Sequence, residues 1–197
     1  LIPSCPISII SRDFNLVYSA MFPGVIAGEF NIDETLVNIY SLANSAKISF
    51  IRDEVSDIDF LQKKILFHKR PYIKYSKLVL NFGSETKIES KYRELFYSQI
   101  AFPIKPLYKS YQIIKGEDYN NNSKALPFVV VGSGLAAIEI AFALRTRWAY
   151  RKLFLVCETE KINGKILERL KQLNIFVKEN INFDHGKVLL YRQSMPV

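Results

Sequence analysis

One stretch predicts the fold most directly: Phe128-Val129-Val130-Val131-Gly132-Ser133-Gly134-Leu135-Ala136-Ala137-Ile138-Glu139-Ile140-Ala141. Its first four residues are apolar and mostly β-branched, as expected of a parallel strand that is covered on both faces. Gly132 and Gly134 predict a tight turn whose backbone approaches a phosphate, and Ala137 stands at the third glycine position of the dinucleotide-binding fingerprint. The small and apolar residues that follow predict a helix.

The start of that helix is the predicted dinucleotide site. A helix N-terminus offers free N–H groups and a positive dipole end to a pyrophosphate. We expect the cofactor contacts at Gly132, Ser133, Gly134, Leu135 and Ala136. A turn that is purely structural is the alternative.

A second strand, at residues 152–156, closes the βαβ unit and leads to Glu158. Glu158 follows the fingerprint by about 20 residues, where an acidic side chain accepts hydrogen bonds from an adenosine ribose. An acid at this place repels a 2′-phosphate, which favours NADH over NADPH. The nearby Lys161 weakens that preference.

Composition indicates a globular chain. Its 197 residues, 49% of them hydrophobic, can build one large or two small domains. The sequence has no apolar run near the roughly 18 residues of a membrane span and no basic leader, so we expect a cytoplasmic protein. Cys5, Cys157, His68 and His185 are isolated, which supports neither a disulfide framework nor a metal site. We expect Cys157 to be a buried small hydrophobe.

The net charge of +8 and the pI near 9.4 raise a nucleic-acid or anionic-membrane hypothesis. The lysines are scattered, and the nearest approach to a patch is Lys63-Lys64 with His68-Lys69-Arg70. A solvated surface explains such scatter better than a nucleic-acid site does. We therefore predict no nucleic-acid partner and at most peripheral membrane contact.

The remaining pattern indicates alternating strands and helices. Strands are expected at residues 6–11, 48–51, 55–59, 64–67, 77–82, 174–177 and 187–190, with a turn at residues 184–186, and two or three of the short ones should form antiparallel hairpins. Helices are expected after an N-cap at Asp33, at residues 107–115 and at residues 163–173. Residues 12–23 are expected to be a loop whose many apolar side chains cover core or a flat ligand, and residues 116–123 an exposed linker.

Several stretches resemble the two-dinucleotide flavoproteins of the pyridine nucleotide-disulfide oxidoreductase superfamily, most closely its type II NADH dehydrogenase-like proteins. Residues 10–28 resemble the strand end, arginine and flavin-covering loop of that family. Within them, Tyr18-Ser19-Ala20-Met21-Phe22-Pro23-Gly24 is similar to the NADH-dehydrogenase-like half found fused to selenide, water dikinase. Residues 70–84 resemble the second flavin motif, and residues 102–106 the segment that follows it. With the fingerprint, the resemblance covers nearly the whole chain.

The resemblance implies roles for individual residues. It implies FAD contacts at Ser11, Arg12, Met21, Pro23, Gly24, Val55, Gly83 and Ser84. Arg12 would lie near the FAD phosphates or ribose, residues 21–24 against the isoalloxazine, and the Val55 backbone at the adenine. Glu139 resembles the family glutamate near the contact of flavin and nicotinamide, which makes it the catalytic candidate. Ordinary packing or a surface position is the alternative for each.

The sequence also departs from the family. A complete member begins with a strand and a glycine-rich turn that grips FAD, whereas this chain starts after that unit and stops inside the NADH domain. We therefore expect a fragment or a truncated product that binds FAD weakly or not at all. Ser11 stands where an acid usually holds the FAD ribose. The lack of paired cysteines favours the thiol-independent branch of the family.

These observations predict an α/β protein with two Rossmann-like FAD/NAD(P)-binding domains, both incomplete, at residues 1–120 and 121–197. The implied activity is an FAD-dependent NADH oxidoreductase that passes electrons to a quinone or another acceptor. One alternative is a non-catalytic nucleotide-binding or interaction module linked to selenium or sulfur metabolism. The other is a basic nucleic-acid-binding protein. An exposed strand edge would favour a homodimer.

Overall fold

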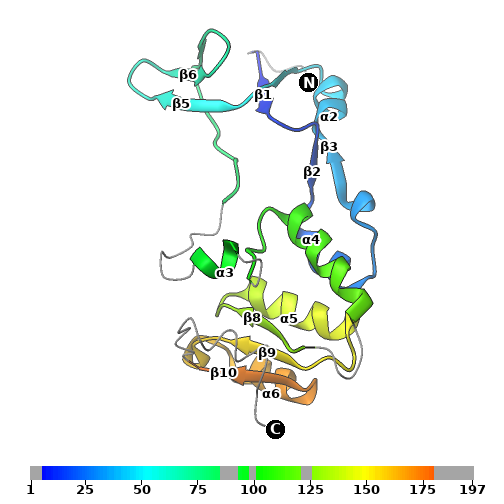
Figure 1. Ribbon diagram of the computed structural model, residues 1–197. Coiled ribbons are helices and arrows are strands. Elements are labelled where there is room, and N and C mark those ends of the chain that lie inside the picture. Colours follow the sequence, from blue (N-terminus) through cyan, green and yellow to red (C-terminus); the bar gives the residue numbers. More distant parts are fainter. Residues whose placement is uncertain (1–5, 85–92, 98–100, 121–125, 180–197) are drawn as a thin grey trace. The chain divides into compact units, whose positions relative to one another are not determined.

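The computed structural model describes residues 6–84, 93–97, 101–120 and 126–179. The chain divides into two compact units (Figure 1). Unit 1 comprises Leu1–Tyr18 and Leu36–Ser84, and unit 2 comprises Ser19–Thr35 and Glu85–Val197. Both contain helices and strands, in agreement with the expected α/β class. The division into cofactor domains at residue 120 stays a prediction.

Unit 2 contains the predicted βαβ unit and extends it by one strand. In chain order it consists of β8 (Phe128–Val131), α5 (Leu135–Arg147), β9 (Leu153–Val156), α6 (Gly164–Gln172) and β10 (Ile175–Lys178). The three strands form a parallel sheet in the order β10-β9-β8. The predicted strands and helices between residues 128 and 178 are confirmed within two residues at each end.

Burial explains why these segments form the sheet and its helices. All four residues of the central strand β9 are buried, as its unbroken apolar sequence requires. Leu144 of α5 and Leu170 of α6 are fully buried, whereas the lysines of α6 are exposed. The side chain of Asn163 caps α6 by accepting a hydrogen bond from the Lys165 N–H at 2.9 Å.

One arginine holds the end of α5 to the strands that follow. The Arg145 guanidinium donates hydrogen bonds of 2.8–3.0 Å to four carbonyl oxygens, those of Trp148, Ala149, Arg151 and Asn174. Burial lowers the pKa of Arg145 from its usual value. The turn after α5 and the start of β10 are thereby joined.

Helix α1 (Phe22–Ala27) was not expected, and the prediction of a loop over residues 12–23 is wrong. Residues 15–17 form β2, residues 19–21 form the 3-10 helix η1, and α1 follows at once. Pro23 stands in the first turn of α1, and Gly28 ends it with a φ of 86°, a conformation that favours glycine. Val25 and Ile26 are fully buried, so this apolar segment contributes to the core.

Helix α1 packs against α5 and against α4 (Leu107–Gly116). The prediction of a helix at residues 107–115 is confirmed. The following residues, expected to be a linker, begin with the 3-10 helix η4 (Glu117–Asn120), and residues 121–123 lie outside the described part. Unit 2 also contains η2 (Ile32–Thr35), α3 (Arg93–Tyr97) and η5 (Thr159–Lys161).

A polar cluster connects α5, η4 and α1. Arg147 donates from Nε and Nη2 to the two carboxylate oxygens of Asp118, and Trp148 donates from Nε1 to the same carboxylate at 2.9 Å. Arg147 also donates to the carbonyl oxygens of Val25 and Ile26, at the end of α1. Burial alone would raise the pKa of Asp118, but these hydrogen bonds and the charge of Arg147 outweigh it, and the pKa is lowered.

Unit 1 consists of small sheets. β1 (Ser8–Ser11) pairs in parallel with β4 (Ser49–Arg52), and β2 (Asn15–Val17) pairs antiparallel with β3 (Leu36–Asn38). β5 (Val55–Asp59), β6 (Lys64–Phe67) and β7 (Ile73–Lys74) form an antiparallel sheet. The predicted hairpins are confirmed for β5 and β6, whereas β4 pairs with β1 instead of joining them.

Two further predictions for unit 1 are wrong. Helix α2 (Ile39–Ser45) begins later than expected, because Asn38 and not Asp33 is its N-cap: the Asn38 side chain accepts a hydrogen bond from the Ser41 N–H at 2.7 Å. Residues 77–82 form no strand, since none of the described ladders includes them. A strand is stable only when it has a partner.

The turn at residues 184–186 and the strand at residues 187–190 lie outside the described residues. In the described part of the chain, no helix is long and apolar enough to cross a membrane. The same residues contain no group of three or more His, Cys, Asp or Glu side chains arranged to hold a metal ion.

Candidate functional site

The glycine turn between β8 and α5 is built by a close approach at Gly132. Gly132 has a φ of 146°, a conformation that L side chains rarely adopt, and a Cβ at this position would lie 3.1 Å from the Cβ of Ala137. Glycine at position 132 therefore lets the turn close onto α5 without strain. Ala137, at the third glycine position of the fingerprint, is small enough to allow the approach.

Gly134 differs from Gly132, because its own conformation does not require glycine. Its φ is −82°, and a Cβ at this position would meet no atom within 4 Å. Gly134 is the N-cap of α5, with no side-chain hydrogen bond to the helix. The open space beside it allows a ligand to approach the backbone closely.

Backbone N–H groups at the start of an α-helix have no partner within the helix. Ala137 and Ile138 both donate to the carbonyl oxygen of Gly134 and so begin the hydrogen bonding of the helix. Leu135 and Ala136 come before them, and helix geometry leaves such N–H groups free to bind an anion. The side chains of Leu135 and Ala136 are exposed.

Glu158 is fixed to the glycine turn through its backbone. The Glu158 N–H donates to the Ser133 hydroxyl oxygen at 2.9 Å. The Glu158 carboxylate is half-exposed and pairs with Lys161 Nζ at 2.5 Å. The hydrogen bond and the charge of Glu158 raise the pKa of Lys161. The structure thus brings Ser133 and Glu158 together. The Glu158 carboxylate pairs with Lys161, the lysine that weakens the predicted preference for NADH over NADPH.

Two other predicted residues of unit 2 lie near this turn in sequence. Glu139 stands on the second turn of α5 with its side chain exposed. Cys157 precedes Glu158, and the prediction that it is buried is confirmed, since only 5% of it is exposed. Burial raises the pKa of the Cys157 thiol, so the thiol form is favoured over the reactive thiolate.

The predicted FAD contacts are divided between the two units. In unit 1, Ser11 ends β1 beside the end of β4, where the Asp53 N–H donates to the Ser11 carbonyl at 3.1 Å, and Arg12 follows Ser11. Arg12 forms an exposed ion pair with Glu54 at 3.2 Å, and Val55 follows at the start of β5. The structure therefore brings Ser11, Arg12 and Val55 to one edge of unit 1. Gly83 and Ser84 follow β7 outside any strand or helix.

Met21, Pro23 and Gly24 belong to unit 2, where Met21 is the N-cap of α1 and the other two lie in its first turn. The Phe30 ring covers Gly24, and a Cβ at Gly24 would come within 2.6 Å of it. Packing alone is therefore a sufficient reason for glycine at position 24. The FAD role of these three residues stays a prediction.

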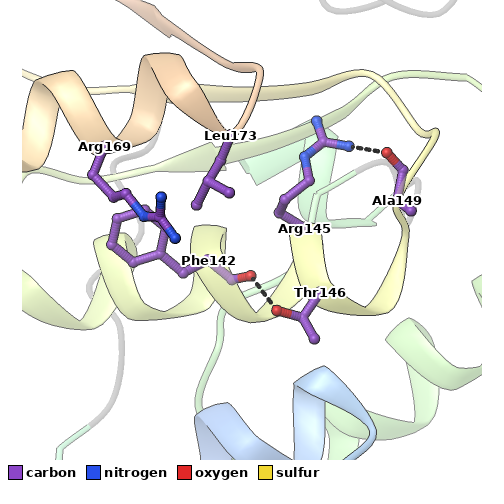
Figure 2. A pocket seen from close by; sticks show the side chains of 6 residues that line it. All are labelled: Phe142, Arg145, Thr146, Ala149, Arg169 and Leu173. Atoms are coloured by element: carbon purple, nitrogen blue, oxygen red, sulfur yellow. Dashed lines mark hydrogen bonds between the residues drawn. The ribbon is translucent and has the colours of Figure 1, made fainter.

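A separate pocket of about 490 Å³ lies between α5 and α6 (Figure 2). Six residues line it: Phe142, Arg145, Thr146, Ala149, Arg169 and Leu173. Thr146 donates from its hydroxyl to the Phe142 carbonyl, and Arg145 donates to the Ala149 carbonyl, as the dashed lines show. Phe142 is about 10 Å along α5 from Leu135. The pocket thus lies away from the glycine turn, and the nucleotide hypothesis does not use it.

Sequence reasoning missed two links that shape the site. The hydroxyl of Ser133 holds the backbone of Glu158, although the fingerprint leaves this position open. The cluster of Asp118, Arg147 and Trp148 fixes the far end of α5. No sequence signal indicated the cluster, because Asp118 lies in a polar run about 30 residues before its partners.

The sequence matches no protein-family model and no curated protein. Solved structures do match. NADH:rubredoxin oxidoreductase from Clostridium acetobutylicum aligns with 94% of this chain and 49% of its own, with a TM-score of 0.65 and 21% identity. The NAD-dependent persulfide reductase from A. fulgidus aligns over 89% and 35%, with a TM-score of 0.70 and 14% identity.

NDH2 from Plasmodium falciparum, solved in complex with NADH, aligns with 89% of this chain and 43% of its own, with a TM-score of 0.55 and 14% identity. This chain spans half or less of the length of each of these three structures. At such low identity the likeness establishes a shared fold.

Proposed function

We propose that this chain is the nucleotide-binding part of an NADH-dependent oxidoreductase of the type II NADH dehydrogenase-like kind. Unit 2 binds NADH at the glycine turn, and the complete protein passes electrons through FAD to a quinone or another acceptor. The single observation that carries the proposal is the contrast between two glycines: any other residue at position 132 would strain the turn, whereas the space beside Gly134 is open.

The residues of the turn fit an NADH pyrophosphate. Absence of a side chain at Gly134 lets the phosphates reach the free N–H groups at the start of α5. Glu158, held at the end of β9 by its bond to Ser133, accepts hydrogen bonds from the adenosine ribose. The similarity to oxidoreductases that use NAD or NADH supports this assignment.

The chain's own residues would bind and orient the cofactor, while bound NADH supplies the hydride. Glu139, exposed one turn along α5, is the proposed positioning residue on the nicotinamide side. The FAD role rests on the resemblance of residues 10–28 and 70–84, with Ser11, Arg12 and Val55 gathered at one edge of unit 1.

Titration with NADH, followed by the quenching of Trp148 fluorescence or by calorimetry, tests the proposal with Gly134→Ala as the variant. The added methyl group meets no protein atom, so the fold should keep its stability. It occupies the space of the pyrophosphate, and we expect NADH binding to weaken by about tenfold or more. Equal NADH affinity in the variant and the parent would refute the site.

Gly132→Ala is the matched structural control. Here the methyl group strains the backbone and presses on Ala137, so we expect a loss of about 1–3 kcal/mol in stability.

A visible absorbance spectrum of the purified protein distinguishes the oxidoreductase from a non-catalytic nucleotide-binding module. Flavin bands that NADH bleaches would support the oxidoreductase, whereas NADH binding by a colourless protein that takes up no FAD would support the non-catalytic module.

A further inference from the structure

Figure 1 shows the turn that joins β5 to β6 in unit 1. Two large apolar side chains of this turn are exposed to solvent. Phe60 is 65% exposed and Leu61 is 97% exposed. Single exposed apolar residues are common on proteins, but Phe60 and Leu61 are adjacent and together form an apolar tip on the β5–β6 turn. Both belong to unit 1, whereas the proposed NADH site belongs to unit 2.

The turn is held in its shape from within. The Asp59 carboxylate accepts a hydrogen bond from the Gln62 N–H at 2.8 Å, which closes the turn around Phe60 and Leu61. Lys63 adopts a φ of 53°, and its carbonyl oxygen accepts a hydrogen bond from the Tyr75 N–H at 3.0 Å. The exposure of Phe60 and Leu61 therefore belongs to a defined turn flanked by a three-stranded sheet.

Three lysines lie at the same end of the sheet as the apolar tip. Lys64 and Lys74 are paired across β6 and β7 at this end of the sheet, and Lys63 precedes them in the turn. Lys64 Nζ lies 4.3 Å from the centre of the Tyr72 ring. Asp59 is the acidic residue of the turn, and its carboxylate is engaged by the backbone. The tip thus combines two apolar side chains with a net positive rim.

We propose that the β5–β6 turn is a membrane-contact site: Phe60 and Leu61 enter the interface of an anionic lipid bilayer, while Lys63, Lys64 and Lys74 lie at the level of the headgroups. Apolar tips flanked by basic side chains suit such an interface, because burial of the apolar groups and attraction to anionic lipids add together. A nucleic acid fits less well, since the most exposed side chain, Leu61, offers no ring for base stacking.

Sedimentation with vesicles tests the proposal on the 197-residue chain. We expect binding to vesicles of phosphatidylcholine with phosphatidylglycerol, weak binding to phosphatidylcholine alone, and a loss of binding as salt rises. The double variant Phe60→Ser with Leu61→Ser should bind about tenfold or more weakly. Lys63→Gln and Lys74→Gln should each lower binding roughly fivefold.

Tyr150→Ser is the matched control, because Tyr150 is 88% exposed but lies in unit 2. It should bind vesicles like the parent. Equal binding by the double variant, or no binding to any vesicle, would overturn the proposal. Capture by a single-stranded RNA oligonucleotide without vesicle binding would overturn it too, in favour of a nucleic-acid surface.

Phe60→Trp gives a readout that does not depend on a disruptive change. The parent contains one tryptophan, Trp148, which is fully buried in unit 2 and supplies a constant background. Brominated acyl chains should quench the added fluorophore in anionic vesicles and leave the parent signal unchanged. Vesicle binding without this quenching would show that the tip stays outside the bilayer and would refute the proposal.

Discussion

The two units bury very different amounts of apolar surface. Of the 22 buried hydrophobic residues in the described part of the chain, only Ala43, Ile65 and Phe67 belong to unit 1. In unit 2, β9 is buried throughout and lies between two parallel neighbours. In unit 1, β1 pairs with one strand among the described residues. The rings that pack together there, those of Phe14, Tyr40 and Phe50, are all at least partly exposed.

This difference indicates which unit is the more stable. In unit 2 the sheet and helices that flank the glycine turn between β8 and α5 share a buried apolar core, and the proposed NADH site lies beside it. Unit 1 consists of small sheets with few buried apolar side chains, and the segment after β7 leaves Val79 at 90% and Phe82 at 74% exposure. We infer that unit 2 is the more stable part, since buried apolar area is the main favourable term in folding.

The largest effect should come from opening the core of unit 2. Leu155 is fully buried in β9, so Leu155→Ala should lower the free energy of unfolding by about 3 kcal/mol. Ile9→Ala, at a half-buried position in β1 of unit 1, should cost about 1 kcal/mol. Urea unfolding measures both. Hydrogen exchange followed by segment should show Leu155→Ala loosening residues 128–178, and equal loosening of both units would contradict the comparison.

A smaller effect should follow from Asp118→Asn, which removes the carboxylate from the cluster with Arg147 and Trp148. We expect a loss of about 2 kcal/mol at neutral pH, because a charged acceptor with several hydrogen bonds is replaced. Asp13→Asn, at an exposed position in unit 1, should change stability by less than about 0.5 kcal/mol.

The same cluster should make stability depend on pH. The native pKa of Asp118 is lowered, so its contribution is complete above the pKa of an unfolded aspartate, about 3.9, and is lost as the pH falls toward the native value. Unfolding measured along an acid series should show this loss in the parent and a reduced loss in Asp118→Asn. Parallel curves for the two proteins would mean that the cluster does not titrate as inferred.

The sequence predicts the elements and pairings of a unit better when the interacting residues are close together along the chain. The strands and helices of unit 2 between residues 128 and 178 follow each other directly, so local periodicity and glycine chemistry suffice to predict them. In unit 1 the parallel partner of β1 is about 40 residues away. Periodicity identified β4 as a strand, but no local pattern specifies that it pairs with β1.

Two errors had different causes. Residues 77–82 have a strand-like apolar pattern, but such a segment forms a strand only when another strand pairs with it. For α1 a signal was present: Pro23 in the first turn and Gly28 after the last is the usual asymmetry of a short helix. At the candidate site, the sequence predicted the glycine turn, whereas the bond from Glu158 to Ser133 depends on side-chain geometry that no sequence pattern encodes.

The smallest effects on stability should come from replacing one exposed glutamate in each unit, and the two replacements should differ in their effect on nucleotide binding. Glu158 pairs with Lys161, and Glu54 pairs with Arg12, and both pairs are well exposed. Glu158→Gln and Glu54→Gln should therefore each change stability by less than about 1 kcal/mol.

Only Glu158→Gln should alter nucleotide binding, because it weakens the acceptor for the ribose and frees Lys161 to attract a 2′-phosphate. We expect NADH to bind about fivefold more weakly and NADPH to bind more tightly. Calorimetric titration of both variants with both nucleotides measures this, and an unchanged NADH to NADPH ratio in Glu158→Gln would remove Glu158 from the site while leaving the glycine turn in place.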